Sequence, residues 1–241
     1  MDFKDLILKI ENKVAHLMIN RPEKANSMNE NAWNELKSAL LYCDETPEIR
    51  AIVFSGAGEK LFCAGIDLQM LMSTNEKTNS TCEGRKREKF RKLLLDFQEI
   101  ISTFEKINKP VLSAVNGACI GAGLDMIAAT DMRYCTTDAY FCIKEIDLGM
   151  VADIGTLQRL PKIIPDGMAR ELAYTGRNLT AEEALKCGLV NKVFDNKETM
   201  LKEVTAMAEL IASKSPLSIR GTKRNIVFTR DHSVAESLEF M

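Results

Sequence analysis

KPVLSAVNGACIGAGLDM, residues 109–126, is the stretch that decides the fold. Its first part predicts an apolar strand at Val111–Val115, and the letters NG that follow are typical of a turn. The letters GAG at 121–123 then predict the start of a helix that runs to about Thr130. A glycine-rich turn at a helix start presents unpaired backbone N–H groups and the positive end of the helix dipole. We therefore expect this turn to bind a phosphate or to stabilise a developing oxyanion.

Two common nucleotide motifs do not fit this turn. The spacing of Gly117, Gly121 and Gly123 differs from the G-x-G-x-x-G fingerprint of dinucleotide sites. No Lys-Ser or Lys-Thr pair follows, as it would in a phosphate-binding loop. An oxyanion or another anion remains the ligand that the turn predicts.

Asp125, Glu145 and Asp153 lie in segments that are otherwise small and apolar: GACIGAGLDMIAATD, FCIKEIDLG and MVADIGTLQRL. A buried carboxylate must be paired, hydrogen-bonded or neutral, because an isolated buried charge is very costly. Carboxylates whose pKa is shifted by burial and mutual repulsion are typical of proton-transfer catalysis. Structural alternatives exist: Asp125 as a first-turn acid favoured by the helix dipole, and Asp153 as the N-cap of a helix over Ile154–Leu160. The placement favours an enzyme over a binding module.

Strand-like and helix-like patterns alternate along the rest of the chain, which indicates an α/β fold. We expect a core domain over residues 1–195 and a helical C-terminal region over residues 196–241 that is incomplete at its end. A polar segment from about Ser73 to Glu88 is interpreted as a mobile surface loop. The letters TAEE at 180–183 have the form of a capping box, and a last helix begins near His232. The remaining predicted strands are Leu6–Ile10, Val14–Ile19, Ala51–Phe54, Arg133–Cys135 and Tyr140–Cys142, and the remaining helices are Asn29–Tyr42, Glu88–Glu105 and Lys197–Ala212.

Composition excludes several classes of protein. A net charge of −2 gives no basic surface for nucleic acid. The seven cysteines are scattered without a C-x-x-C pair, so buried free thiols are expected rather than a metal or disulfide framework. No apolar run approaches the ~20 residues of a membrane span, and the first residues match no targeting segment. These features predict a soluble cytoplasmic protein that binds no metal, no membrane and no nucleic acid.

A second glycine-containing segment, LFCAGIDL at 61–68, joins the first to give a recognisable set. Together with RPEKANSMN and GTLQRLP, these motifs cover most of the chain from about Ile19 to Val193. The set resembles the crotonase (enoyl-CoA hydratase/isomerase) superfamily. The resemblance implies a crotonase-like spiral of ββα units, a homotrimer or a homohexamer built as a dimer of trimers, and an acyl-CoA thioester as substrate. It implies no cofactor beyond the coenzyme A carried by the substrate.

The resemblance also assigns residues to an oxyanion hole and to a coenzyme A channel. By position, the backbone N–H groups of Ile66 and Ala122 would hold the thioester oxygen as it gains enolate charge. The coenzyme A channel would be lined by five residues. These are Lys24, Ala25, Ala64, Asp67 and Leu68, with a solvated loop lysine as the plain alternative for Lys24.

The three acids distinguish members of this superfamily. A hydratase carries two glutamates at the positions of Asp125 and Glu145, and has a small residue at the position of Asp153. The set found here resembles the 3,5-dienoyl-CoA to 2,4-dienoyl-CoA isomerases of unsaturated fatty acid β-oxidation, as does RDHSVAESL near the C-terminus. In that chemistry Glu145 would take a proton from C2, Asp153 would protonate C6, and Asp125 would sit beside Glu145. A 2-enoyl-CoA hydratase and an inactive CoA-binding scaffold remain the alternatives.

Overall fold

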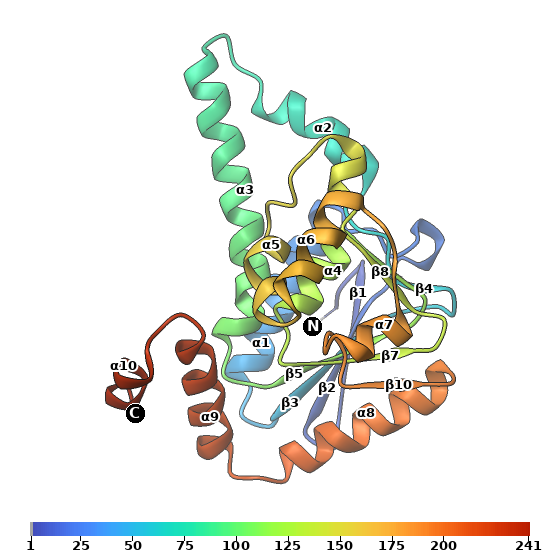
Figure 1. Ribbon diagram of the computed structural model, residues 1–241, viewed down its shortest axis with the longest axis vertical. Helices are drawn as coiled ribbons and strands as arrows, with labels where there is room; N and C mark the ends of the chain where they lie inside the picture. The colour runs from blue at the N-terminus through green and yellow to red at the C-terminus, as the bar shows by residue number, and fades with distance from the viewer. Residues whose placement is uncertain (1) are drawn as a thin grey trace.

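The computed structural model describes residues 2–241, which form an α/β fold with two sheets (Figure 1). The larger sheet has six strands in the order β1-β2-β3-β5-β7-β10, and the smaller has four in the order β4-β6-β8-β9. The strands of the larger sheet are β1 Leu6–Glu11, β2 Val14–Ile19, β3 Ala51–Gly56, β5 Val111–Val115, β7 Met132–Thr136 and β10 Lys192–Phe194. Those of the smaller sheet are β4 Leu61–Cys63, β6 Ala118–Ile120, β8 Tyr140–Cys142 and β9 Leu179–Thr180.

Strands β5 and β6 belong to different sheets although only Asn116 and Gly117 separate them. Gly117 has a positive φ of 56°, and a Cβ there would lie 2.2 Å from the carbonyl oxygen of Lys60. The turn therefore requires glycine, because both its backbone conformation and its close approach exclude a side chain. This crossing carries the chain from the large sheet to the start of α4 (Ala122–Ala128).

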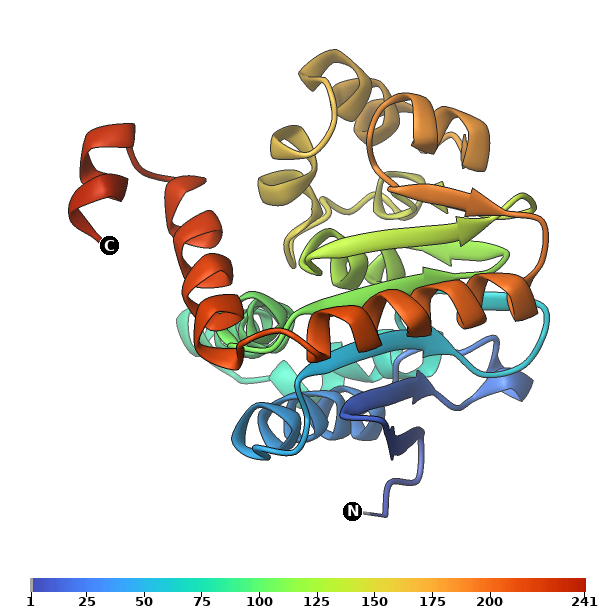
Figure 2. The same ribbon diagram turned by 90° about the horizontal axis from the view of Figure 1, so that it is seen from below.

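Helices cover both faces of the six-stranded sheet. Alternate residues of β3 point to opposite sides: Val53 packs in the cluster beneath α8 (Lys197–Ala212), and Phe54 in the larger core. Figure 2 shows α8 lying over this face of the sheet, running roughly along the strands. The helices on the side of the larger core include α1 Glu30–Glu45, α3 Glu83–Lys106 and α4. The remaining helices are α2 Leu68–Thr78, α5 Thr156–Arg159, α6 Asp166–Thr175, α7 Ala181–Lys186, α9 Pro216–Thr229 and α10 Val234–Glu239, with 3-10 turns at Pro22–Lys24, Glu145–Leu148 and Leu160–Lys162.

The prediction of a loop from Ser73 to Glu88 is wrong. Helix α2 continues to Thr78, and α3 begins at Glu83, five residues before the predicted start at Glu88. The first turns of α3 project from the body and have no core to face (Figure 1). Their Glu, Lys and Arg side chains are good helix formers. The polar composition of this segment therefore indicates a solvent-exposed helix and not a loop.

The capping box is confirmed. The Thr180 side chain accepts from the N–H of Glu183, whose carboxylate accepts from Thr180 N–H, and α7 ends just before Gly188. The N-cap alternative for Asp153 is wrong, because α5 starts at Thr156 and its N-cap residue is Gly155.

The C-terminal part begins on the sheet and then leaves it. Strand β10 pairs in parallel with β7, and α8 packs on the sheet through Met200 and Val204. Helix α9 then leaves the sheet near the C-terminal end of α3, and α10 lies further from the body (Figures 1 and 2). The proposed division between residues 195 and 196 stays a prediction. Within residues 2–241, no helix has both the length and the apolar character needed to cross a membrane.

Candidate active site

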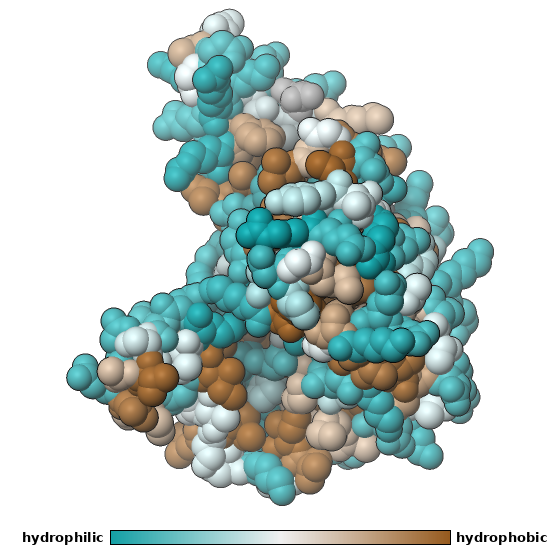
Figure 3. Space-filling model, viewed as in Figure 1, coloured by the Kyte–Doolittle hydropathy of each residue, from teal (hydrophilic) through white to brown (hydrophobic). Residues whose placement is uncertain are grey.

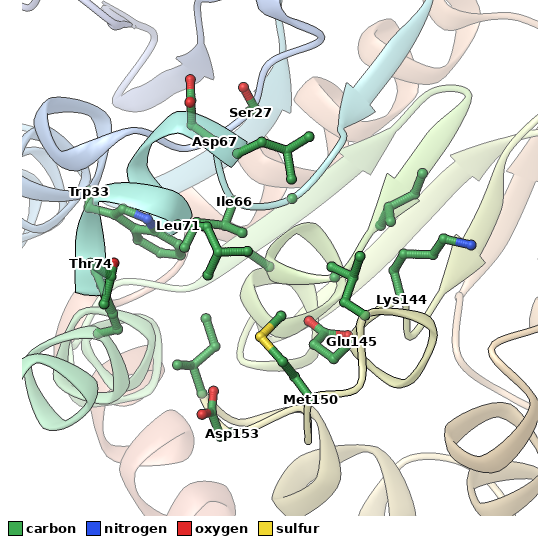
Figure 4. Close-up of a pocket in the computed structure, with 18 of the residues that line it drawn as sticks. Ser27, Trp33, Ile66, Asp67, Leu71, Thr74, Lys144, Glu145, Met150 and Asp153 are labelled. Atoms are coloured by element: carbon green, nitrogen blue, oxygen red, sulfur yellow. The ribbon is translucent and has the colours of Figure 1, made fainter. Parts of the chain in front are cut away.

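A cavity of about 720 Å³ lies between the glycine-rich turn, α2, α3 and the segment that follows β8. Its walls are largely apolar, and they include Phe90 and Phe97 from α3 and Leu71 from α2. The acids Glu145 and Asp153 and the predicted oxyanion residues Ile66 and Ala122 line the same cavity. Figure 4 shows Glu145 and Asp153 on the wall, with Met150 between them. An apolar cavity with a few convergent polar groups is the usual form of a small-molecule site.

The backbone N–H groups of Ile66 and Ala122 are both free to donate into this cavity. Around Ile66, Met28 N–H donates to Gly65 O (2.8 Å) and Asp67 N–H donates to Met28 O (3.0 Å), so the chain is fixed on both sides of it. Ala122 is the first residue of α4, where an N–H has no partner within the helix. Neither N–H has a hydrogen-bond acceptor among residues 2–241.

Close packing brings these two donors together. The φ of Gly65 is 97°, and a Cβ there would lie 3.1 Å from the carbonyl oxygen of Ile120 and 3.6 Å from the backbone nitrogen of Ala122. Glycine is favoured here because of this positive φ and the close approach to Ile120. The arrangement can therefore hold one oxygen that gains negative charge between the two N–H groups.

Glu145 lies at the start of the 3-10 turn after β8 and faces the glycine-rich turn. Its Oε1 is 3.0 Å from the point that a Cβ on Gly121 would occupy. Its other oxygen, Oε2, is buried and has no partner among the described residues. Burial raises the pKa of Glu145, and the nearby charge of Asp153 raises it further. A carboxylate with a raised pKa and a free oxygen can act as a base beside an oxyanion site.

Asp125 is fully buried on α4 and does not line the cavity. Its Oδ1 accepts a hydrogen bond of 2.6 Å from the backbone N–H of Thr156, at the start of α5. Burial raises the pKa of Asp125 to about 7; the hydrogen bonding of Thr156 opposes this shift, and the charge of Glu145 adds to it. The charge of Glu145 thus affects the pKa of Asp125. The hydrogen bond of Asp125 connects it to the segment that follows Asp153.

Asp153 lies between the 3-10 turn and α5, outside any helix or strand. Its side chain has no hydrogen bond and no ion pair with residues 2–241, and it lines the cavity. Although the residue is exposed in the single chain, partial desolvation still raises the pKa of its carboxyl group. Its backbone carbonyl accepts a hydrogen bond of 2.6 Å from Gln98 Nε2 on α3.

Four of the five residues expected to contact coenzyme A line the cavity. These are Lys24, Ala64, Asp67 and Leu68. Ala25 is not among the lining residues; its carbonyl accepts from Ala64 N–H at 3.0 Å, and its φ is 52°. Ala25 therefore fixes the backbone of Ala64 from behind.

Asp67 is also a structural residue. Its Oδ1 accepts from Gln69 N–H as the N-cap of α2, and its Oδ2 pairs with Arg21 at 3.1 Å. Burial alone would raise the pKa of Asp67, but the hydrogen bonds from Arg21 and from backbone N–H groups lower it below its usual range. The buried Arg21 thus keeps Asp67 charged at the mouth of the cavity.

Sequence reasoning did not select Arg21, Trp33 or Gln98 as site residues. Arg21 lies within the quoted motif RPEKANSMN, so the sequence indicated a cation that needs an acidic partner. It did not indicate which acid that partner is. Trp33 packs against Phe97 at 5.4 Å between ring centroids and forms part of the cavity wall. Gln98 is a polar residue in the apolar run LLLDFQEII, which is a weak signal that a side chain is needed for a specific contact.

Comparison with known proteins places this geometry in a family. The sequence profile described as Enoyl-CoA hydratase/isomerase matches residues 9–240. The chain belongs to the enoyl-CoA hydratase/isomerase family. The predicted crotonase-type resemblance is confirmed, and the chain is an enzyme of this family.

Curated members of the family are similar over nearly the whole chain. The human protein named Delta(3,5)-Delta(2,4)-dienoyl-CoA isomerase, mitochondrial, is 43% identical over 98% of this chain and 72% of its own length. The peroxisomal protein of the same name from Arabidopsis thaliana is 44% identical over 96% of this chain and 83% of its own. A crotonyl-CoA hydratase from Syntrophomonas wolfei is 35% identical, covering 92% of this chain and 81% of its own.

Solved structures of the enoyl-CoA hydratase/isomerase family confirm the predicted fold. The enoyl-CoA hydratase from Bacillus anthracis superposes with a TM-score of 0.88 at 30% identity, over 98% of this chain and 87% of that one. The enoyl-CoA hydratase/isomerase from Marinobacter aquaeolei gives a TM-score of 0.88 at 27% identity, with the same coverage of 98% and 87%.

The expectation of a cytoplasmic protein is wrong. The similar isomerases carry mitochondrial names in human and mouse, and a peroxisomal name in Arabidopsis thaliana. These names point to an organelle. The cytoplasmic expectation rested on the residues at the start of the chain, and those residues do not establish where a protein works.

Proposed function

We propose that the protein is a 3,5-dienoyl-CoA to 2,4-dienoyl-CoA isomerase of unsaturated fatty acid β-oxidation. The observation that carries this proposal is that a second acid, Asp153, faces the same cavity as Glu145 (Figure 4). The reaction removes a proton from C2 and adds one at C6, and these carbons are several ångströms apart. Two separated carboxyl groups match that requirement better than one. Relatives named for this activity, at 43–44% identity, support the same reaction.

The proposed mechanism has two proton transfers. Glu145 removes a proton from C2, and the electrons move into the thioester carbonyl and the two double bonds to form an extended dienolate. The N–H groups of Ile66 and Ala122 stabilise the charge on the thioester oxygen; losing one such donor typically costs ~3–4 kcal/mol. Asp153 then donates its proton to C6, which leaves the double bonds at C2–C3 and C4–C5. One proton leaves the substrate and one is added, so substrate and product are isomers.

The electrostatics suit a pair of carboxyl groups that shares one proton. The reaction begins with Glu145 ionised and Asp153 protonated, so the pair carries one proton and one negative charge. Burial raises the pKa of both groups, and the charge of Asp153 raises the pKa of Glu145 further. Two neighbouring carboxyl groups therefore resist ionising together, which favours the singly protonated pair that the reaction needs.

The coarser features of the substrate follow from the family. An acyl-CoA thioester would place its carbonyl oxygen between the two N–H donors and its acyl chain along the apolar wall formed by α2 and α3. Lys24, Ala64, Asp67 and Leu68 would line the entrance for coenzyme A, with Ala25 behind them. No cofactor beyond the coenzyme A of the substrate is proposed.

A homotrimer or homohexamer is the proposed assembly. Helices α9 and α10 expose large apolar residues, which Figure 3 shows gathered at the end of the chain. They include Leu217, Ile226, Val234, Leu238 and Phe240. Exposed apolar side chains gathered in one region are typical of a contact between subunits. Light scattering coupled to gel filtration would give the mass of the assembly, and a monomer would contradict this part of the proposal.

A diene assay tests the main proposal. Purified protein is mixed with 3,5-octadienoyl-CoA, and formation of the conjugated 2,4-dienoyl-CoA is followed by its ultraviolet absorbance. A parallel reaction with 2-butenoyl-CoA measures water addition. The hydratase relative at 35% identity makes hydration the second candidate. Rapid hydration without diene isomerisation would overturn the proposal, and isomerisation with slow hydration would support it.

A further inference from the structure

The proposed proton donor lies in a segment that has no regular structure of its own. Asp153 belongs to the connection between the 3-10 turn at Glu145–Leu148 and α5. Its carboxyl group has no partner among residues 2–241, so side-chain contacts do not hold it in place. The position of the carboxyl group depends on how the backbone of the segment is fixed.

We propose that Gln98 is a positioning residue for Asp153, an inference that rests on the proposed isomerase function. Gln98 Nε2 on α3 donates to the backbone carbonyl of Asp153 at 2.6 Å. Its neighbour Phe97 lines the cavity, so the same turn of α3 forms part of the apolar wall proposed to contact the acyl chain. This turn also holds the connection that carries Asp153, which we call the donor segment. Gln98 itself does not touch the cavity, and it acts through Asp153 alone.

The other end of the segment is held from α4. Asp125 Oδ1 accepts from Thr156 N–H at 2.6 Å, three residues after Asp153. Between the two anchors, Gly155 has a φ of 143°, and Arg159 packs against it where any Cβ would lie. The segment is thus fixed at Asp153 by α3 and at Thr156 by α4.

Arg159 connects the second anchor back to α3. It pairs with Glu105 at 2.6 Å and donates to Ser102 Oγ at 3.1 Å. Both partners lie on α3, one and two turns after Gln98. Helix α3 therefore contacts the donor segment directly through Gln98 and indirectly through Arg159. Glu145 and the oxyanion donors are held by other elements. Removing Gln98 should disturb one proton transfer and leave the other.

This separation defines the experiment. A displacement of about 1 Å in a catalytic group can cost up to ~100-fold in rate. For Gln98→Leu we expect kcat for diene isomerisation to fall about tenfold, with KM changed less than about twofold. In D2O, exchange at C2 of recovered 3,5-octadienoyl-CoA, measured by mass spectrometry, should stay near the wild-type rate. Exchange at C2 reports Glu145 and the oxyanion site, whereas formation of product also requires Asp153.

Two further variants make the test specific. Gln98→Glu keeps the size of the side chain but removes the N–H donor, so it should lose kcat as Gln98→Leu does. Glu99→Leu is the control on the same helix, because Glu99 pairs with Lys106 instead of the donor segment; its kcat should match wild type. Melting temperatures of all variants verify folding.

The outcomes separate this inference from the function on which it rests. Wild-type kcat in both Gln98 variants would overturn the positioning role while leaving the isomerase proposal intact. A parallel loss of C2 exchange and product formation would also overturn it, because the effect would not be specific to Asp153. Absence of isomerisation in the wild-type protein would overturn both.

Discussion

Asp125, Glu145 and Asp153 are alike as amino acids and differ in their surroundings. Asp125 is fully buried, with one oxygen held by Thr156 N–H; Glu145 has a buried free oxygen; Asp153 has an unpartnered carboxyl group on the cavity wall. Burial raises the pKa of each. Different contacts thus suit three similar groups to three different proposed roles: an anchor for Asp125, a base for Glu145 and a proton donor for Asp153.

Asp153→Asn should abolish most isomerisation without unfolding the protein. The amide keeps the shape of the side chain but cannot supply an acidic proton, and general acid catalysis is worth ~10²–10⁴-fold. We expect kcat to fall at least ~100-fold. Exchange at C2 in D2O should continue, and the melting temperature should change little because the carboxyl group has no partner to lose. Asp138→Asn, at an exposed turn, is the control, and near-normal turnover of Asp153→Asn would show that Asp153 is not the donor.

Asp125→Asn should make stability less dependent on pH. The pKa of Asp125 rises from 3.8 to about 7 in the folded chain, so the folded state binds this proton more tightly than the unfolded state. Its contribution to stability is therefore fully present below pH 3.8 and is lost as pH rises through about 7. Asparagine retains the acceptor for Thr156 N–H without a charge.

The variant should then exceed wild type in stability at pH 8 by at most about 4 kcal/mol, because one pKa unit is worth about 1.4 kcal/mol. The difference should shrink toward pH 4.5. Urea unfolding at both pH values measures it. If variant and wild type differed in stability by the same amount at both pH values, Asp125 would not be the group that titrates between them.

At the scale of elements, the start of α4 positions both Ala122, the proposed oxyanion donor, and Glu145, the proposed base. Gly121 has a φ of 51°, its N–H donates to Cys142 O at 2.9 Å, and it leaves room for the Glu145 carboxylate. The N–H of Ala122 and the oxygens of Glu145 are adjacent for this reason. A helix start of small residues is thus a requirement of the site as well as of the turn.

Gly121→Ala should lower activity more than stability. The new Cβ would lie 3.0 Å from Glu145 Oε1, and alanine at φ 51° and ψ −117° adds strain of roughly 1–3 kcal/mol. We expect kcat to fall at least tenfold, on the order expected for a displaced catalytic group, when measured in the diene assay. Gly167→Ala in α6 is the matched control: a Cβ there meets nothing within 4 Å, and activity should not change. Equal activity of the two variants would contradict the close approach.

At the scale of the whole molecule, a buried lysine joins the C-terminal helices to the body. Lys223 on α9 donates to Phe104 O at 2.8 Å, to Lys109 O at 2.9 Å and to Asp131 Oδ2 at 2.9 Å. Its side chain closes the C-terminal end of α3, where carbonyl groups lack helical partners. Burial lowers the pKa of Lys223, and the charge of Asp131 opposes that shift.

Lys223→Met should destabilise the protein by about 3 kcal/mol, because it leaves buried carbonyl oxygens and a carboxylate without their charged donor. Urea unfolding measures the free energy. Lys202→Met, at an exposed position of α8, is the control and should stay within about 0.5 kcal/mol of wild type. A similarly small change in Lys223→Met would show that α9 is held by its apolar contacts instead.

Much of the fold was predictable because its signals are local. Strands such as Val111–Val115 were correctly bounded, and the capping box at Thr180 was correct in both of its hydrogen bonds. The segment from Ser73 to Glu88 was misjudged because solvent-facing helix and loop share a polar composition. Helix propensity would have distinguished an exposed helix from a loop here. The prediction of a loop relied on polarity instead.

By itself the sequence determined the family, the glycine-rich turns and the identity of the three acids, since each depends on residues close together in the chain. Only the tertiary structure decided their partners. Asp125 meets Thr156 across 31 residues, and Gln98 meets Asp153 across 55. Such pairs form because α3, α4 and α5 pack on one another in three dimensions, and no local pattern records which polar group lies opposite which. The three acids could be identified from the sequence, whereas the roles proposed for them follow from how the chain packs.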